Sequence, residues 1–349
     1  MKKFKNLTIE ENINLGQLTT MKIGGQAKYI TAVKNIDEIR EALEFAKQEN
    51  LPIFVLGGGS NTIVHDKGFS GLVIKNEIFG QELLGEDDFS KTFKIGAGEN
   101  WDEFCQWAVR EQNLSGCEAM AMIPGTVGAL PVQNVGAYGQ ETSQIFESCE
   151  AVNLETGELE ILSKEDCRLG YRSSIFREEA AGKYFITSVN LRLFKQAQKV
   201  PLYFSVEEYF KNHGIDGEKA TPIQIMEAVI FLRSEKLPDP ADIPSAGSFF
   251  KNVEIPAVSA RQFLAVHPEA LILPSEREGF FKIPTGWLID AAGLRGKIIH
   301  GMRPHDKNAL ILTNISAKNY TDLAAARAEI QRVVKEKFGF EIEQEPLEI

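Results

Sequence analysis

The spacing of apolar residues divides the start of the chain into strand, helix and strand. Mostly apolar stretches at 27–33 and 52–56 predict two strands, the second of them buried, and Asn35 lies between them as a possible N-cap. Helical spacing follows this cap in Ile36, Ile39, Leu43 and Ala46. The order predicts a β-α-β unit, which ends at the glycine-rich residues 57–61.

The next region predicts a sheet with one helix and one unusual loop. Strands are predicted at 72–75, 92–95, 151–154, 159–162 and 184–194. A helical stripe is formed by Trp101, Phe104, Cys105 and Ala108. From Met122 to Gly139 the chain is rich in glycine and nearly uncharged. A nearly uncharged segment is unfavourable as a solvent-exposed loop, so we expect it to be functional or buried.

The last region begins after a helix at 222–236, which is stopped by Leu237-Pro238-Asp239-Pro240. Beyond this linker we expect strands at 248–253 and 309–312 and helices at 260–266, 286–292 and 323–338. Gly339 stops the last helix. The boundaries predict domains at 1–75, 76–237 and 238–340, followed by a C-terminal strand at 341–349.

Composition and charge narrow the possible partners. Of the 349 residues, 43% are hydrophobic and 25% charged, as in an ordinary globular protein. The net charge of −11 argues against nucleic-acid binding, which needs a surplus of Lys and Arg. No apolar run reaches the ~18 residues of a membrane span, and residues 1–6 lack the features of a signal peptide. We therefore expect a cytoplasmic protein without a membrane or nucleic-acid partner.

The four cysteines are scattered without a C-x-x-C pair, which favours buried thiols over a disulfide framework or a zinc site. The five histidines show no metal-binding spacing. We expect no metal.

Two glycine-rich segments are the main candidates for ligand binding. At Gly57-Gly58-Gly59-Ser60-Asn61, backbone N–H groups can approach an anion without Cβ obstruction, although a plain glycine turn is the alternative. The spacing fits neither a Rossmann fingerprint nor a P-loop. In 122–139, bare backbone amides suit a flat heterocycle with many acceptors, and the alternative is a buried connection.

Both segments resemble, in order and spacing, the FAD-binding segments of the UDP-N-acetylenolpyruvoylglucosamine reductase family. Matching blocks continue in the same order over nearly the whole chain, at 98–101, 170–176, 233–240, 246–252 and 286–290. The resemblance implies an α+β fold in three domains: two FAD-binding domains of the vanillyl-alcohol-oxidase type and a third that closes over the sugar nucleotide. It further implies a monomer that uses non-covalent FAD and NADPH to reduce UDP-N-acetylglucosamine enolpyruvate to UDP-N-acetylmuramate for peptidoglycan.

The resemblance assigns a set of backbone and small residues to FAD. They are Gly57, Gly58, Gly59, Ser60, Asn61, Pro124, Gly125, Gly128, Gln133, Gly136 and Ala137. Leu130 departs from the family, which has a small residue there, and we assign it no cofactor contact.

The catalytic residues are also implied by the resemblance. Arg172 can give an enolpyruvyl carboxylate two parallel charge-assisted hydrogen bonds, although alone it would be interpreted as a solvated charge. Ser248 corresponds to the family's proton donor to the α-carbon, although alone it would be interpreted as a strand residue. In a strand, Glu341, Glu343 and Glu345 share one face, and periodicity cannot choose among them. The family motif selects Glu345. Because Pro346-Leu347 departs from the motif, Glu343 is the alternative.

The remaining matches are predicted to bind the substrate. They are Tyr171, Tyr203, Arg233, Lys236, Asn252 and Asn308. Tyr203 matches the diphosphate-covering tyrosine of the family's longer subtype. Two other functions stay open: another FAD oxidoreductase of this fold, with His65 as the residue near the glycine segment that could attach FAD covalently, and a flavin- or sugar-nucleotide-binding protein without turnover.

Overall fold

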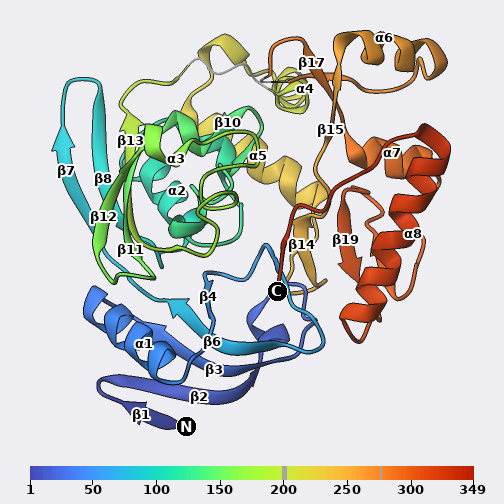
Figure 1. The fold of residues 1–349 in the computed structure, drawn as a ribbon. Coiled ribbons are helices and arrows are strands. Elements are labelled where there is room, and N and C mark those ends of the chain that lie inside the picture. The colour runs from blue at the N-terminus through green and yellow to red at the C-terminus, as the bar shows by residue number, and fades with distance from the viewer. Residues whose placement is uncertain (199–202, 276) are drawn as a thin grey trace. The chain divides into compact units, whose positions relative to one another are not determined.

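The computed structural model describes residues 1–198, 203–275 and 277–349, which form two compact units (Figure 1). Unit 1 comprises Met1–Ile13, Ala27–Gly58 and Ser70–Glu235. Unit 2 comprises Asn14–Gln26, Gly59–Phe69 and Lys236–Ile349. Separate stretches of sequence therefore combine in each unit, and the division into three domains stays a prediction. Val200, Pro201 and Leu202, which precede Tyr203 in its predicted block, lie outside the described residues.

Unit 1 begins with a five-stranded sheet covered by one helix. In spatial order its strands are β1 (Lys2–Phe4), β2 (Leu7–Asn14), β3 (Gln26–Val33), β6 (Phe69–Asn76) and β4 (Ile53–Leu56). Helix α1 (Ile36–Gln48) lies on one face of the sheet (Figure 1), because Ile39, Phe45 and their neighbours form one core with Leu72 and Ile74. The predicted strands and helix are confirmed. Asn35 caps α1, since its side chain accepts from the Glu38 N–H at 2.9 Å.

The second sheet of unit 1 is antiparallel. Its strands, in order, are β12 (Leu159–Ser163), β11 (Phe146–Asn153), β13 (Tyr184–Phe194), β8 (Ser90–Gly96) and β7 (Gln81–Glu86). Helix α2 (Trp101–Arg110) packs its stripe of Trp101, Phe104 and Cys105 into the core of this sheet. The β11–β12 turn contains Gly157 at φ 75°, a left-handed conformation that glycine adopts without strain.

Further helices and short strands complete unit 1. They are η2 (Glu118–Met120), η3 (Val127–Ala129), β9 (Gly136–Ala137), β10 (Gln140–Glu141), η4 (Thr142–Gln144), α3 (Lys164–Cys167), α4 (Phe204–His213), η5 (Gly217–Lys219) and α5 (Pro222–Lys236). Helices α4 and α5 share a small core of Val206, Phe210, Ile225 and Val229. The predicted bounds of α5 are confirmed.

The described part of unit 2 contains three α-helices and small sheets, which are antiparallel except for the β5–β20 pair. The strands are β5 (Thr62–Ile63), β14 (Ser245–Ser248), β15 (Val253–Pro256), β16 (Leu273–Pro274), β17 (Phe280–Ile283), β18 (Met302–Pro304), β19 (Ile311–Asn314) and β20 (Leu347–Glu348). The helices are η1 (Leu15–Leu18), α6 (Ala257–Val266), α7 (Thr285–Ala291) and α8 (Tyr320–Phe338). The sheets β14-β19-β18 and β15-β17-β16 pack with α7 and α8 around Phe249, Leu288 and Ile330. Gly339, at φ 77°, ends α8 as predicted.

Two predicted strands of unit 2 are wrong. The strand expected at 248–253 is two strands, because β14 ends at Ser248 and β15 begins at Val253. Between them, the Phe249 N–H bonds to the Leu310 carbonyl at 2.9 Å and Phe250 forms a bridge with Gln344. Of the strand expected at 341–349, only Leu347–Glu348 forms a strand, β20, which pairs in parallel with β5. In both segments, hydrogen-bond partners far along the chain determine where the strands begin and end.

Two smaller expectations concern the cysteines and the helices. All four cysteines are buried free thiols, as predicted, and the Cys105 thiol donates to the Cys117 carbonyl. Across residues 1–198, 203–275 and 277–349, no helix is both long and apolar enough to cross a membrane.

Candidate active site

The two glycine-rich segments lie against each other in unit 1. A Cβ at Gly57, just after β4, would lie 2.9 Å from the Thr126 hydroxyl. A Cβ at Gly58 would lie 3.0 Å from the Gly125 Cα. These distances are tighter than ordinary side-chain contacts, so a larger residue at either position would force the neighbouring segment to shift. The structure therefore joins, in one place, the two segments that are predicted to bind the same cofactor.

Asn134 is a buried amide that the sequence did not single out. It lies within 122–139 at 1% exposure, with its backbone at φ 46°. Its side-chain oxygen accepts from the Ser143 N–H at 2.8 Å, but Nδ2 has no hydrogen-bond partner among the described residues. A buried N–H donor without a partner could donate to the acceptor-rich edge of a flavin. The one signal in the sequence that could have pointed to Asn134 is that asparagine adopts left-handed backbone more readily than most residues.

The other predicted cofactor residues of this segment have structural roles as well. A Cβ at Gly128 would lie 2.6 Å from the Ala97 Cβ, and one at Gly136 would lie 2.6 Å from the Gln140 carbonyl. The Gln133 side-chain oxygen accepts from Arg177 at 2.5 Å. Leu130 is 1% exposed and packs in the core of the second sheet. The departure at Leu130 is therefore accommodated by the core.

Arg172 is held against the same segment in a strained backbone conformation. It lies in a turn that is closed by two hydrogen bonds between Gly170 and Ser173, and its φ is 51°. Its Nη2 donates to the Gly136 carbonyl at 3.1 Å, and its guanidinium lies 5.5 Å from the centre of the Tyr171 ring. A left-handed conformation at an arginine costs about 1–3 kcal/mol and persists only where surrounding contacts hold it. Such conformations concentrate at functional sites.

Arg233 contacts the other end of this segment. Its Nη2 donates to the Met122 carbonyl at 3.1 Å, whereas its Nε has no partner in the described part of the chain. Burial lowers the pKa of Arg233, although the nearby Tyr138 and Asp102 oppose the shift. A buried cation without a carboxylate partner is costly, and an anionic ligand would balance it.

Tyr203 and Lys236 lie at helix ends. Tyr203 precedes α4, and its ring packs edge to face on Tyr138 with the centroids 5.7 Å apart. Burial raises the pKa of both tyrosines, so their hydroxyls stay protonated donors at neutral pH. Lys236 is exposed at the last position of α5.

In unit 2, a β-bulge directs Ser248. Between the pairs Ser245↔Thr313 and Ser248↔Ile311, β14 has one residue more than β19, and Gly247 takes up the difference at φ 65°. The following Phe249 and Phe250 are 0% and 1% exposed, with ring centroids 5.1 Å apart. A packed pair of buried aromatic rings therefore follows Ser248 directly in the chain.

The C-terminal glutamates differ in burial. Glu345 is 7% exposed, and its N–H bonds to the Phe249 carbonyl at 2.9 Å, next to Ser248. The Glu343 side chain is 74% exposed and pairs with Lys251 at 3.3 Å. Glu341 pairs with Lys335 at the surface. Periodicity could not choose among the three carboxylates, but their burial favours Glu345, which the family motif selects, over Glu343.

The other predicted residues of unit 2 take part in backbone bonding. The Asn252 side-chain oxygen accepts from the Thr285 N–H at 3.1 Å, and that of Asn308 accepts from the Leu310 N–H at 3.2 Å. Gly59 has φ 66°, the Ser60 carbonyl accepts from the Thr20 hydroxyl, and the Asn61 carbonyl accepts from the Leu347 N–H. Ligand roles for these residues stay predictions.

Comparison with known proteins identifies the family. An FAD binding domain model matches residues 27–163, and a model of the UDP-N-acetylenolpyruvoylglucosamine reductase C-terminal domain matches residues 239–349. The UDP-N-acetylenolpyruvoylglucosamine reductase of Burkholderia multivorans is 38% identical over 330 residues, 94% of this chain and 93% of that protein. The chain belongs to this reductase family. The reductase of Chromobacterium violaceum is 37% identical over 98% of this chain and 99% of its own.

The reductase family also accounts for the fold. The crystal structure of the UDP-N-acetylenolpyruvylglucosamine reductase from Thermus caldophilus has a TM-score of 0.68 at 24% identity, covering 98% of this chain and 99% of that one. The predicted family resemblance and α+β fold are confirmed.

His65, the candidate for covalent flavin attachment, is engaged within unit 2. Its Nε2 lies 2.9 Å from a Glu348 carboxylate oxygen, and its ring stacks on Tyr320 with the centroids 3.8 Å apart. These contacts favour non-covalent FAD. Among the described residues, no group of three His, Cys, Asp or Glu side chains is arranged to hold a metal ion.

Proposed function

We propose that this protein reduces UDP-N-acetylglucosamine enolpyruvate to UDP-N-acetylmuramate, with NADPH as the reductant and FAD bound non-covalently. The observation that carries the proposal is Arg172, whose left-handed backbone lies in the Gly170–Ser173 turn and whose guanidinium donates to the Gly136 carbonyl of the predicted flavin segment. Membership of the reductase family supplies the substrate class.

The residues that would hold FAD are the predicted glycine segments, to which we add Asn134. Gly57 and Gly58 pack closely on Thr126 and Gly125, and without side chains of their own they offer backbone N–H groups as donors. The buried Nδ2 of Asn134 is a further donor. When bound, FAD transfers the reducing equivalents of NADPH to the substrate as a hydride.

Arg172 and Glu345 would act on the enolpyruvyl group. A guanidinium binds a carboxylate through two charge-assisted hydrogen bonds and stabilises the negative charge that hydride addition to the methylene places on the neighbouring enolate. Glu345, as the family's partner of this arginine, would hold the enol.

Ser248 would then protonate the α-carbon. A hydroxyl is a weak acid, so this step requires a strongly basic carbon and a fixed donor position. The bulge at Gly247 and the buried Phe249 fix the Ser248 backbone. The proton lost by the serine must be replaced from solvent before the next turnover.

The other predicted residues would bind parts of the substrate that do not react. We assign the diphosphate to Arg233, Lys236, Tyr203 and Asn308, and the enolpyruvyl sugar to Tyr171 and Asn252. Arg233 has the strongest physical support, because its buried charge lacks an ion-pair partner among the described residues. We also propose that the protein is a cytoplasmic monomer, in keeping with its free thiols.

The decisive experiment measures NADPH oxidation by the purified yellow protein with and without the UDP-enolpyruvyl sugar. We expect stoichiometric formation of UDP-N-acetylmuramate and release of intact FAD by acid. FAD that stays attached after acid precipitation would support a covalent oxidase instead. Binding of FAD and sugar nucleotide without turnover would identify a silent binding protein. Size-exclusion chromatography with light scattering tests the monomer.

A further inference from the structure

The C-terminal tail, residues 343–349, is bonded to unit 2 on both sides of Glu345. On the N-terminal side, the Lys251 N–H donates to the Glu343 carbonyl at 2.8 Å, and the Glu345 N–H donates to the Phe249 carbonyl at 2.9 Å. On the C-terminal side, the Leu347 N–H donates to the Asn61 carbonyl and the Ile349 N–H to the Ile63 carbonyl, both at 2.9 Å. Glu345 thus lies between two attachments, followed by a proline that has no N–H to donate.

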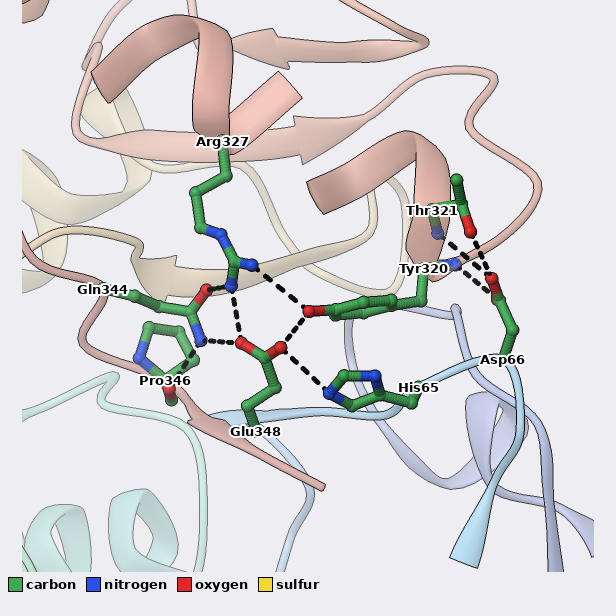
Figure 2. Close-up of polar contacts among 8 residues, drawn as sticks. All are labelled: His65, Asp66, Tyr320, Thr321, Arg327, Gln344, Pro346 and Glu348. Atoms are coloured by element: carbon green, nitrogen blue, oxygen red, sulfur yellow. Dashed lines mark hydrogen bonds and ion pairs between the residues drawn. The ribbon is translucent and has the colours of Figure 1, made fainter. Parts of the chain in front are cut away.

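The second attachment includes a carboxylate network around Glu348 (Figure 2). Arg327 of α8 donates to one Glu348 oxygen at 2.5 Å, and Gln344 donates to the same oxygen at 3.0 Å. His65 lies 2.9 Å from the other oxygen, which also accepts from the Tyr320 hydroxyl. Arg327 donates in addition to the Gln344 side-chain oxygen at 2.6 Å. One carboxylate therefore connects the tail to α8 and to the residues after β5.

The partners of Glu348 are themselves held in place. The Tyr320 ring stacks on His65, and the Asp66 carboxylate accepts from the Tyr320 N–H at 2.6 Å and the Thr321 N–H at 3.1 Å. Burial raises the pKa of Glu348, but hydrogen bonds from Tyr320, Arg327 and Gln344 outweigh it and leave the pKa below its usual range. Glu348 is therefore ionised at neutral pH and pairs with a charged Arg327.

We propose that the Glu348–Arg327 pair is a positioning device that fixes Glu345 beside Ser248. The inference rests on the proposed function, because it takes Glu345 as the carboxylate that holds the enol. Glu345 and Glu348 are close in sequence, and Gln344 and Glu348 bond to the same guanidinium on opposite sides of Glu345. Loss of the pair weakens the side-chain network that links the two flanks of Glu345, while the backbone bonds of the tail remain. A shift of ~1 Å in a catalytic group can slow a reaction about 100-fold.

The test uses Glu348→Gln in the full-length flavoprotein, with the two half-reactions measured separately. We expect normal FAD content and normal reduction by NADPH, but reoxidation by the UDP-enolpyruvyl sugar slower by about 10- to 100-fold, with kcat affected more than KM. Glu336→Gln is the matched control, because Glu336 forms a comparable pair with Arg332 at 2.7 Å on the exposed face of α8. The control should reoxidise at the wild-type rate.

A double-mutant cycle separates positioning from a direct role. If Glu348 acts through Glu345, adding Glu348→Gln to Glu345→Gln should slow reoxidation less than twofold further. Effects that multiply, or a Glu348→Gln protein that reoxidises at the wild-type rate, would overturn the proposal. Should Glu348→Gln fail to fold, Glu348→Asp retains the charge on a shorter side chain and is expected to show the same effect on a smaller scale.

A readout without turnover tests the same device if the proposed function is wrong. Hydrogen exchange measured by mass spectrometry should be faster in residues 343–349 of Glu348→Gln than of wild type and Glu336→Gln, with the rest of unit 2 unchanged. Unchanged exchange in the tail would overturn the positioning role whatever the enzyme reduces. Faster exchange in a protein that does not reduce the UDP-enolpyruvyl sugar would retain the device and reject the function.

Discussion

Two partly buried arginines, one in each unit, are held in opposite ways. In unit 1, Arg233 donates to the Met122 carbonyl, its Nε has no partner among the described residues, and burial lowers its pKa. In unit 2, burial also lowers the pKa of Arg327, but hydrogen bonds to Glu348 and Tyr320 outweigh it and the pKa is raised. The charge of Arg327 is balanced by the protein, whereas that of Arg233 is not. The paired charge of Arg327 suits a structural role, whereas the charge of Arg233 suits the binding of an anionic ligand.

The contrast extends to the rest of each unit. Unit 1 surrounds its glycine-rich segment with backbone contacts, and Arg172 and Arg233 both donate to carbonyl oxygens of that segment. Unit 2 uses a bulge and a carboxylate network to direct Ser248 and Glu345. On our proposal, unit 1 supplies most of the cofactor-binding residues and the two anion-binding arginines. Unit 2 supplies the proton and the enol-holding carboxylate, and it also contains further ligand residues such as Gly59 and Lys236. Each prediction below tests one side of this division.

The largest effect is expected in unit 2, from Ser248→Ala. FAD content and flavin reduction by NADPH should stay near normal, because neither needs a proton at carbon. Reoxidation by the UDP-enolpyruvyl sugar should slow by ~10²–10⁴-fold, as expected for a lost general acid. Stopped-flow absorbance measures both steps, with Ser259→Ala in α6 as the control. Wild-type reoxidation in Ser248→Ala would leave Ser248 with only a role in β14, and the proton would come from water or Glu345.

The next prediction compares the two arginines directly through Arg233→Met and Arg327→Met. Arg233→Met should leave the free energy of unfolding unchanged or raised, because it removes a buried unpaired cation, yet it should raise KM for the sugar nucleotide at least about tenfold. Arg327→Met should lower the unfolding free energy by roughly 1.5–3 kcal/mol, because it leaves the Glu348 charge without its main partner. Thermal denaturation and steady-state kinetics measure both. If Arg233→Met destabilised the protein without changing KM, Arg233 would be structural and the contrast would fail.

Gly58 tests the binding side of unit 1. A Cβ there meets the Gly125 backbone at 3.0 Å, so Gly58→Val must push the two glycine segments apart. Overpacking of this kind costs about 1–3 kcal/mol, and FAD should bind about 10- to 100-fold more weakly. Gly85→Val in β7 is the matched control, because nothing lies within 4 Å of a Cβ at Gly85. Flavin fluorescence titration measures the affinity. Equal FAD affinity in the two variants would remove Gly58 from the cofactor site.

Local signals made much of the fold predictable. The helices α1, α5 and α8 have clear helical spacing, and Asn35 and Gly339 mark a start and an end that the structure confirms. β13 was predicted with its observed bounds because it is rich in aromatic and β-branched residues. Where local spacing and packing agree, the sequence is sufficient.

The segments that were missed depend on partners far along the chain. β20 pairs with β5, and Phe250 with Gln344, so nothing in the local sequence marks where those strands begin or end. The same limit applies to the candidate site. Arg172, Ser248 and Glu345 were found only through the family resemblance, since each alone is an ordinary residue. Asn134 and the Glu348–Arg327 pair were not found at all, because what distinguishes them is burial and pairing, which only the folded structure shows.

The smallest effect is expected from removing one matched helix cap in each unit. Asn35 and Asn319 begin α1 and α8, and each side-chain oxygen accepts from a backbone N–H at 2.9 Å. Asn35→Ala should lower the unfolding free energy of unit 1 by about 1 kcal/mol. Asn319→Ala should cost unit 2 less, because Asp66 still accepts two N–H bonds at the start of α8. Calorimetry of the full-length protein should show each substitution lowering only the transition of its own unit. A single transition that both substitutions shift equally would mean that the two units unfold together, and the contrast between them would concern their chemistry alone.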